Sequence, residues 1–286
     1  MTITITTSNV NGIRAAKRKG IEQRAAKNTP DVWGIQEVRA PQNEIDPIFD
    51  EFGFEYATAG RIADQSGLDR MNEICRIKGR AGVGLLSALP VIDKRYGLPG
   101  LAEDVDSGRW IEADVKTPQG YTVTVVCVYV HAGNTDDPEK MKQKYRFLDT
   151  MLVRMGQLRD EAAHGGKQRA LCGDFNIAHT PLDIKNAKAN EKHAGFLPEE
   201  RAYVDKWLGE LEFVDVMRSL CGDIQGPYTW WSQRGRAFDN NVGWRIDYQF
   251  ATPELAETAR GFVIDKAPTY DLRWSDHAPL SITYDV

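Results

Sequence analysis

Six short clusters of polar residues lie at the ends of strand-like apolar segments in this chain. The apolar segment at residues 121–130 is nearly unbroken, which is typical of a central strand covered on both faces. Strands of this kind, separated by helix-like stretches, indicate an α/β fold. If their ends meet at one edge of the fold, the polar clusters meet there too. The clusters occupy residues 8–11, 36–37, 129–131, 173–176, 245–247 and 275–277.

The order of these segments predicts one domain over residues 1–286, because no repeat, low-complexity tract or change of composition marks a linker. We expect an α/β protein of the four-layered α/β sandwich type, with two packed mixed β-sheets flanked by helices. Residues 60–80 are polar and are expected to form a surface loop. Helices are predicted at residues 13–28, 47–52, 139–163 and 198–208. Strands are predicted at residues 2–6, 31–38, 54–59, 82–89, 91–96, 109–116, 121–130, 169–175, 244–251, 261–266 and 278–284.

Cysteine usage and hydropathy indicate a cytoplasmic protein without a membrane span. No window approaches eighteen unbroken apolar residues, and the first residues lack the basic and apolar regions of a secretory signal. The four cysteines are far apart and form no CxxC pair. Cys127 and Cys172 lie in strand-like runs, where a buried reduced thiol is expected.

The net charge of −5 argues mildly against a nucleic-acid partner, because neutralising phosphates requires Lys and Arg. The basic residues are nevertheless clustered, and a cluster of this kind is by itself typical of a solvated face. Charge alone therefore does not decide the partner. The clusters lie at residues 17–19, 76–80, 185–192 and 234–245.

The polar clusters are rich in oxygen donors, and carboxylates seldom end buried strands unless they are paired or bind a metal. Carboxylate and amide oxygens with few His and no Cys favour Mg²⁺, or Mn²⁺, over Zn²⁺. An Asp or Asn after a strand is also a common turn former or helix cap. The residues alone therefore indicate an oxyanion or metal cleft and leave the substrate open.

Several motifs resemble the exonuclease III family of apurinic/apyrimidinic endonucleases, within the endonuclease/exonuclease/phosphatase superfamily. GDFN and SDH are shared across the superfamily, whereas GDFNIAHTPLDIKN, and NVGWR after YTWW, are specific to the DNA-repair branch. The matches follow the family's order from residue 8 to residue 280. They are SNVNGIRA, GIQEVR, GVGLLS, LCGDFNIAHTPLDIKN, NNVGWRIDY and SDHAPL.

The resemblance implies a catalytic role for five residues. Asp174 would activate the attacking water, and Asn176 would hold Asp174 in place. His277 would contact the scissile phosphate, oriented by Asp247, and Tyr129 would contact the same phosphate. These roles agree with phosphodiester hydrolysis, which needs a deprotonated water and compensation of charge on the phosphoryl oxygens.

The resemblance also implies a metal site with Glu37 as the principal Mg²⁺ ligand, joined by Asn9, Asn11 and Asp276. Two departures leave alternatives open. Many relatives carry Asp at the position of Asn11. After Tyr129 they carry Pro and then Asn or Gln, whereas this chain has His131 and later Asn134, either of which could replace the phosphate-contacting amide.

Flat aromatic rings and guanidinium groups are concentrated at residues 230–245, a mixture suited to an extruded abasic sugar and its phosphates. Strict alternation would turn only one of Trp230 and Trp231 inward. Trp244 is expected to form the wall of the abasic pocket. The predicted DNA-binding residues are Trp244, Arg245, Arg236, Asn241 and Trp230.

The sequence therefore predicts a Mg²⁺-dependent DNA repair nuclease, acting as a monomer on duplex DNA with abasic sites or 3′ ends. It would hydrolyse phosphodiester bonds 5′ to abasic sites and remove nucleotides or blocks from 3′ ends. One alternative is a phosphodiesterase or phosphatase of the same superfamily that acts on a lipid or a small phosphoester. A second is a DNA-binding scaffold that has lost activity.

Overall fold

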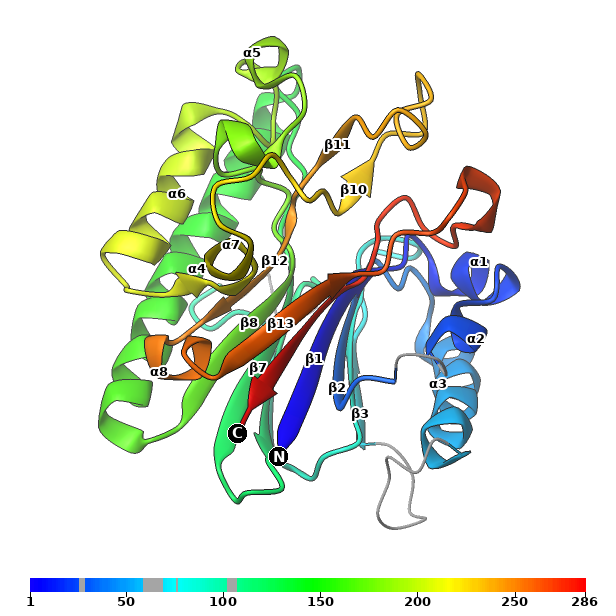
Figure 1. Ribbon diagram of the computed structural model, residues 1–286. Coiled ribbons are helices and arrows are strands. Elements are labelled where there is room, and N and C mark those ends of the chain that lie inside the picture. Colours follow the sequence, from blue (N-terminus) through cyan, green and yellow to red (C-terminus); the bar gives the residue numbers. More distant parts are fainter. Residues whose placement is uncertain (26–28, 59–68, 76, 102–106) are drawn as a thin grey trace.

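Two six-stranded β-sheets packed face to face form the centre of the computed structural model, which describes residues 1–25, 29–58, 69–75, 77–101 and 107–286 (Figure 1). Both sheets are mixed, with one parallel pair each. The first sheet runs β13 (Ala259–Ile264), β14 (Leu280–Asp285), β1 (Thr2–Asn9), β2 (Val32–Gln36), β4 (Val83–Ser87), β3 (Asp69–Glu73). The second runs β5 (Val91–Tyr96), β6 (Trp110–Lys116), β7 (Thr122–Tyr129), β8 (Gln168–Asp174), β12 (Asp247–Ala251), β9 (Val214–Asp215).

Helices cover the outer face of each sheet. Apolar side chains of α4 and α6 pack against the second sheet, and those of α1, α2 and α3 pack against the first. This arrangement confirms the four-layered sandwich. The α-helices are α1 (Ile13–Arg18), α2 (Ile21–Ala25), α3 (Gln42–Thr58), α4 (Pro138–Gly165), α5 (Ala187–Asn190), α6 (Pro198–Gly209), α7 (Val216–Cys221) and α8 (Pro253–Ala256). Short 3₁₀ turns lie at η2 (Pro181–Asp183) and η3 (Tyr270–Leu272).

The core between the sheets consists of the alternate inward side chains of both, such as Ile5 and Val125. The sheets approach most tightly at Gly34, where an added Cβ would lie 2.9 Å from the Cys172 Sγ and 3.2 Å from the Cys127 Sγ. Both cysteines are buried and free, as expected. Within the described residues, no helix has the length and apolarity that a membrane crossing needs.

Strand direction brings the polar clusters together. Parallel β1 and β2 end at Asn9 and Gln36, and parallel β7 and β8 end at Tyr129 and Asp174. Antiparallel β12 and β14 begin at this same end, while both chain termini lie at the other (Figure 1). A two-stranded hairpin, β10 (Trp230–Trp231) and β11 (Gly243–Trp244), rises beyond it.

Three predictions of secondary structure were wrong. Residues 54–59 were expected to form a strand, but α3 continues through Thr58, because its apolar face packs on the first sheet through Phe49 and Phe52. The helix expected at residues 13–28 is two helices, separated at Gly20, which has a φ of 82°. Part of the loop expected at residues 60–80 forms β3 against β4; residues 59–68 and 76 lie outside the described residues.

Candidate active site

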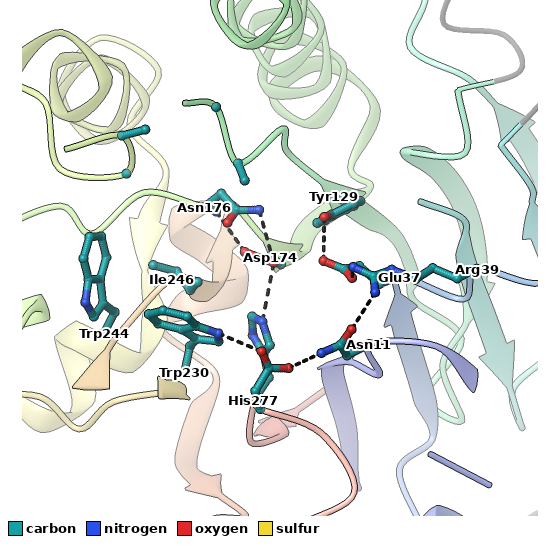
Figure 2. Close-up of a pocket in the computed structure, with 15 residues that line it drawn as sticks. Asn11, Glu37, Arg39, Tyr129, Asp174, Asn176, Trp230, Trp244, Ile246 and His277 are labelled. Atoms are coloured by element: carbon teal, nitrogen blue, oxygen red, sulfur yellow. Dashed lines mark hydrogen bonds and ion pairs between the residues drawn. The ribbon is translucent and has the colours of Figure 1, made fainter. Parts of the chain in front are cut away.

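The polar strand ends line a pocket of about 290 Å³ at this end of the sheets. Figure 2 shows Asp174 and His277 near its centre, Glu37, Arg39 and Asn11 on one side, and Trp230 and Trp244 on the other. Strand register creates this arrangement, because Asp174 of β8 is paired with Tyr129 of β7 and with Asp247 of β12. Tyr129, Asp174 and Asp247, which are far apart in the sequence, therefore lie side by side at the edge where β7 and β8 end and β12 begins.

Asp174 is almost completely buried and is held by three hydrogen bonds. Its carboxylate accepts the Asn9 Nδ2 at 2.8 Å, the backbone N–H of Asn176 at 2.9 Å and the Asn176 Nδ2 at 3.3 Å. Asn176 has a φ of 50°, a left-handed conformation that Asn tolerates better than most residues. Burial, together with the charges of Asp247 and Glu37, raises the pKa of Asp174 to about 7. A carboxylate with this pKa is suited to accept a proton near neutral pH.

His277 bridges two carboxylates. Its Nδ1 lies 2.9 Å from the Asp247 Oδ2, and its Nε2 lies 3.9 Å from the Asp174 Oδ2. Burial lowers the pKa of His277, but the opposing charges of Asp247 and Asp174 outweigh it and raise the pKa to about 10. His277 is therefore an imidazolium at neutral pH. Asp247 is fixed in turn by its backbone N–H, which donates to the Thr229 Oγ1 at 3.1 Å.

Glu37 lies opposite this pair and takes part in a second network. The Tyr129 hydroxyl donates to the Glu37 Oε1 at 2.5 Å, and Arg39 pairs with the Oε2. The Arg39 Nη1 donates to the Asn11 Oδ1 at 2.7 Å, and the Asn11 Nδ2 donates to the Asp276 Oδ1 at 2.8 Å. Burial and the charges of Glu37 and Asp174 raise the pKa of Tyr129, so its hydroxyl keeps its proton.

The Glu37 network is suited to a divalent cation. The Glu37 carboxylate and the Asn11 carbonyl oxygen both contact the guanidinium group of Arg39. These two hard oxygen donors therefore already bind one positively charged group. Within the described residues, Asp174, Asp247 and His277 also place ligand atoms within 4.8 Å of one another. A protonated His277 is not a ligand, however. The Glu37 side is therefore the better candidate for a metal site.

Two tryptophans form the other wall of the pocket. The rings of Trp230 and Trp244 meet edge to face, with centroids 5.9 Å apart, and both line the pocket. The Trp230 Nε1 donates to the Asp276 Oδ2 at 3.2 Å, which joins the aromatic wall to the polar network. Trp231 is 2% exposed, so only one of the adjacent pair is fully inward, as alternation predicted.

Comparison with known proteins identifies the family of this chain. Residues 6–277 match the endonuclease/exonuclease/phosphatase family. The chain belongs to this family. An exodeoxyribonuclease of Bacillus subtilis (strain 168) is 29% identical over 279 residues, which cover 97% of this chain and 98% of that protein.

Solved structures of family relatives share the fold. An AP endonuclease from Archaeoglobus fulgidus superposes with a TM-score of 0.79 at 28% identity, covering 99% of this chain and 100% of that one. A 3′ phosphatase from Neisseria, bound to a product DNA hairpin, superposes with a TM-score of 0.79 at 26% identity over the same shares. These similarities confirm both the sandwich and the predicted resemblance to exonuclease III and AP endonucleases.

Apart from Arg245, the predicted site residues of this family member fall into three groups. Seven line the pocket, namely Asn11, Glu37, Tyr129, Asp174, Asn176, Asp276 and His277, with Trp230 and Trp244 as its aromatic wall. Asn9 and Asp247 are buried behind it and contact Asp174 and His277. Arg236 and Asn241 are exposed in the loop between β10 and β11 and do not line the pocket.

The prediction that Arg245 binds DNA was wrong. Its side chain is fully buried and forms ion pairs of 2.7 Å with Asp183 and with Asp215. Trp244 at the end of β11 lines the pocket, whereas the adjacent Arg245 does not line it and is buried in the core. Arg245 is therefore a core residue that anchors the segment carrying Trp244.

Sequence reasoning also missed pocket residues. Arg39 stood in the GIQEVR motif but was given no role, although it directly follows Glu37 and Val38. It has a φ of 51°, in the left-handed region, and its side chain lines the pocket. Gly195 and Ile246 also line the pocket and carry no chemical signal in the sequence.

Proposed function

We propose that this chain is a Mg²⁺-dependent DNA repair nuclease of exonuclease III type. It hydrolyses phosphodiester bonds 5′ to abasic sites and removes nucleotides or blocks from 3′ ends of duplex DNA. The observation that carries the proposal is one pocket that joins the Asp174–His277 pair to the wall of Trp230 and Trp244. The names of its relatives, an exodeoxyribonuclease, an AP endonuclease and a DNA-bound 3′ phosphatase, support it.

Each side chain has a defined task in this reaction. Asp174 orients the attacking water and accepts its proton, while Asn176 keeps the carboxylate aimed at that water. The imidazolium of His277 and the hydroxyl of Tyr129 donate to phosphoryl oxygens as negative charge develops on them. Glu37, with Asn11 and Asp276 beside it, would hold Mg²⁺ or Mn²⁺, which neutralises charge on the phosphate and on the leaving oxygen when bound.

The surroundings of the pocket fit a damaged duplex. The aromatic faces of Trp230 and Trp244 can pack against a sugar that lacks its base. Exposed basic residues lie on segments that rise beyond the same end of the sheets, at α5 and at the β10–β11 hairpin (Figure 1). They supply phosphate contacts that the net charge of −5 conceals. These bases are Lys185, Lys188, Lys192, Arg234 and Arg236.

A comparison of substrate classes tests the proposal. With Mg²⁺, we expect the protein to cut a duplex with one tetrahydrofuran abasic analogue once, directly 5′ to the analogue. It should also shorten recessed 3′ ends of an intact duplex. Phosphoinositide vesicles should stay unhydrolysed, because the wall of Trp230 and Trp244 is suited to a sugar that lacks its base and not to a lipid headgroup. Gel mapping and phosphate release measure these activities. Faster hydrolysis of the vesicles than of either duplex would favour the lipid phosphoesterase instead.

Asp247→Asn should shift the pH profile of cleavage. The reaction needs protonated His277, and this form is lost as pH rises through its pKa of about 10. Removing the Asp247 charge lowers that pKa, so the alkaline limb of kcat/KM should move down by about one pH unit or more. The acid limb should also move down, because the same charge raises the pKa of Asp174. Limbs that stay in place would contradict the assigned protonation states.

A further inference from the structure

A fully buried ion pair lies directly behind the pocket. Lys144 of α4 and Glu200 of α6 are each 0% exposed, and the Lys144 Nζ lies 2.6 Å from the Glu200 Oε1. The nearest buried residues of α4 after Lys144, Phe147 and Leu148, are apolar. A buried ion pair is often no more stabilising than apolar residues of similar volume, because both charges lose their hydration. Its remaining contacts therefore indicate what the pair does.

The ammonium group of Lys144 ties together two loops of the pocket. The Nζ donates to the backbone carbonyl of Ala132 at 3.1 Å and to that of Asn176 at 2.9 Å. Ala132 follows β7 and Asn176 follows β8, and both line the pocket. The bond to the Asn176 carbonyl holds this residue in its left-handed conformation, in which the Asn176 N–H points at the Asp174 carboxylate.

The carboxylate of Glu200 holds a third loop. Its Oε2 accepts the backbone N–H of Gly195 at 2.6 Å and that of Leu197 at 3.0 Å. Gly195 has a φ of 92°, and an added Cβ there would lie 3.0 Å from the Trp244 ring and 3.2 Å from the Asn176 carbonyl oxygen. The loop that contains Gly195 therefore packs both against Trp244 and against the loop after β8, which contains Asn176.

We propose that Lys144 and Glu200 are positioning residues for the cleavage reaction, acting through Asn176 on Asp174 and through Gly195 on Trp244. Neither side chain reaches the substrate. One buried cation and one buried anion instead fix the relative positions of the three loops that form this side of the pocket. The proposal rests on the nuclease function proposed above.

The test is the double variant K144M/E200Q. Met has a similar volume to Lys without its charge, and Gln keeps a carbonyl oxygen for the N–H groups of Gly195 and Leu197. Because the pair is replaced as a unit, neither variant residue leaves a lone buried charge. We expect kcat on the abasic duplex to fall about 100-fold while KM changes little, because small displacements of reacting groups cost rate more than binding.

A matched control lies on the same helix. Arg154 of α4 forms a buried bidentate pair with Glu112, with both bonds at 2.7 Å, and its other partners, Gln157 and Glu161, do not line the pocket. R154M/E112Q should change the melting temperature by a similar amount or more but keep the wild-type kcat. Hydrogen exchange should accelerate at residues 130–134, 174–178 and 194–197 in K144M/E200Q and not in the control.

The following results distinguish a positioning role from a merely structural one. If both double variants lose kcat in proportion to their folded fraction, Lys144 and Glu200 are merely structural and the proposal is overturned. Unchanged exchange in the three loops would also overturn it. If K144M/E200Q does not fold, the conservative variant E200D takes its place under the same criteria, because it keeps both buried charges but withdraws the carboxylate from the N–H groups of Gly195 and Leu197. Wild-type protein that cleaves neither duplex refutes the nuclease function, and hydrogen exchange then still decides the positioning role.

Discussion

Asp174→Asn should lower kcat on the tetrahydrofuran duplex by about 1000-fold, which is within the range for losing a positioned general base. Asn has the same shape as Asp, and its carbonyl oxygen can still accept one of the bonds from Asn9 and Asn176. It cannot accept a proton from water. Single-turnover cleavage at saturating enzyme measures the chemical step without interference from product release.

The same substitution should not destabilise the protein, and this separates lost chemistry from lost folding. Burial raises the pKa of Asp174 to about 7 from an ordinary value of 3.8, so the folded state binds this proton more tightly than the unfolded state. The ionised carboxylate therefore costs stability, and the cost appears as pH rises from about 4 to about 7. We expect the melting temperature of the variant to equal or exceed that of wild type at pH 8.

A variant that kept more than a tenth of the wild-type rate would remove Asp174 from the role of base. A variant with a lower melting temperature at pH 8 would show that the carboxylate stabilises the fold, against the direction of its pKa. The two measurements are independent, so each can fail alone. Catalytic carboxylates that lower stability are a recognised compromise between stability and activity.

Removing divalent metal should have a comparable effect. With EDTA in excess, we expect the cleavage rate to fall by about 1000-fold, because the compensation of phosphoryl charge that a metal supplies amounts to several kcal/mol. Adding Mg²⁺ or Mn²⁺ back should restore the rate. Glu37→Gln should raise the Mg²⁺ concentration needed for half the maximal rate. The substitution replaces the charged carboxylate of Glu37 by a neutral amide, so only neutral oxygens remain at residues 37 and 11.

The competing cation makes this prediction specific. Without metal, the guanidinium of Arg39 is the positive group that faces Glu37 and Asn11. Cleavage that continued in EDTA at more than a tenth of the Mg²⁺ rate would show that Arg39 and His277 suffice for charge compensation. The proposed metal site at Glu37 would then be unnecessary. A quench-flow or gel time course with matched ionic strength makes this comparison.

The sequence was informative about the pocket because strand direction converts distant segments into neighbours by a simple rule. Because β1 and β2 are parallel, the strands that lead to Asn9 and Glu37 end at one edge of the first sheet. Because β7 and β8 are parallel, those that lead to Tyr129 and Asp174 end at one edge of the second. The packing of the two sheets then places these edges side by side. Predicting the strand ends needed only hydrophobic patterning and the GDFN-type motifs. The catalytic and metal-binding roles given to these residues remain predictions.

Features that depend on long-range burial could not be predicted in the same way. Arg245 was predicted to bind DNA, because its ion-pair partners, Asp183 and Asp215, lie 62 and 30 positions away in the sequence and left no local sign of burial. The Lys144–Glu200 pair also joins two helices through contacts that no local pattern reveals. The strand expected at residues 54–59 failed because packing of α3 on the first sheet overrode a short alternation of apolar residues.

The most direct test of the central claim is cleavage of the tetrahydrofuran duplex in ¹⁸O-labelled water with Mg²⁺, followed by mass spectrometry of both fragments. Attack by a water held at Asp174 predicts one ¹⁸O atom in the 5′-phosphate of the abasic fragment and an unlabelled 3′-hydroxyl on the other. A nick on the 3′ side of the analogue, or a 5′-phosphate without the label, would contradict hydrolysis at this pocket.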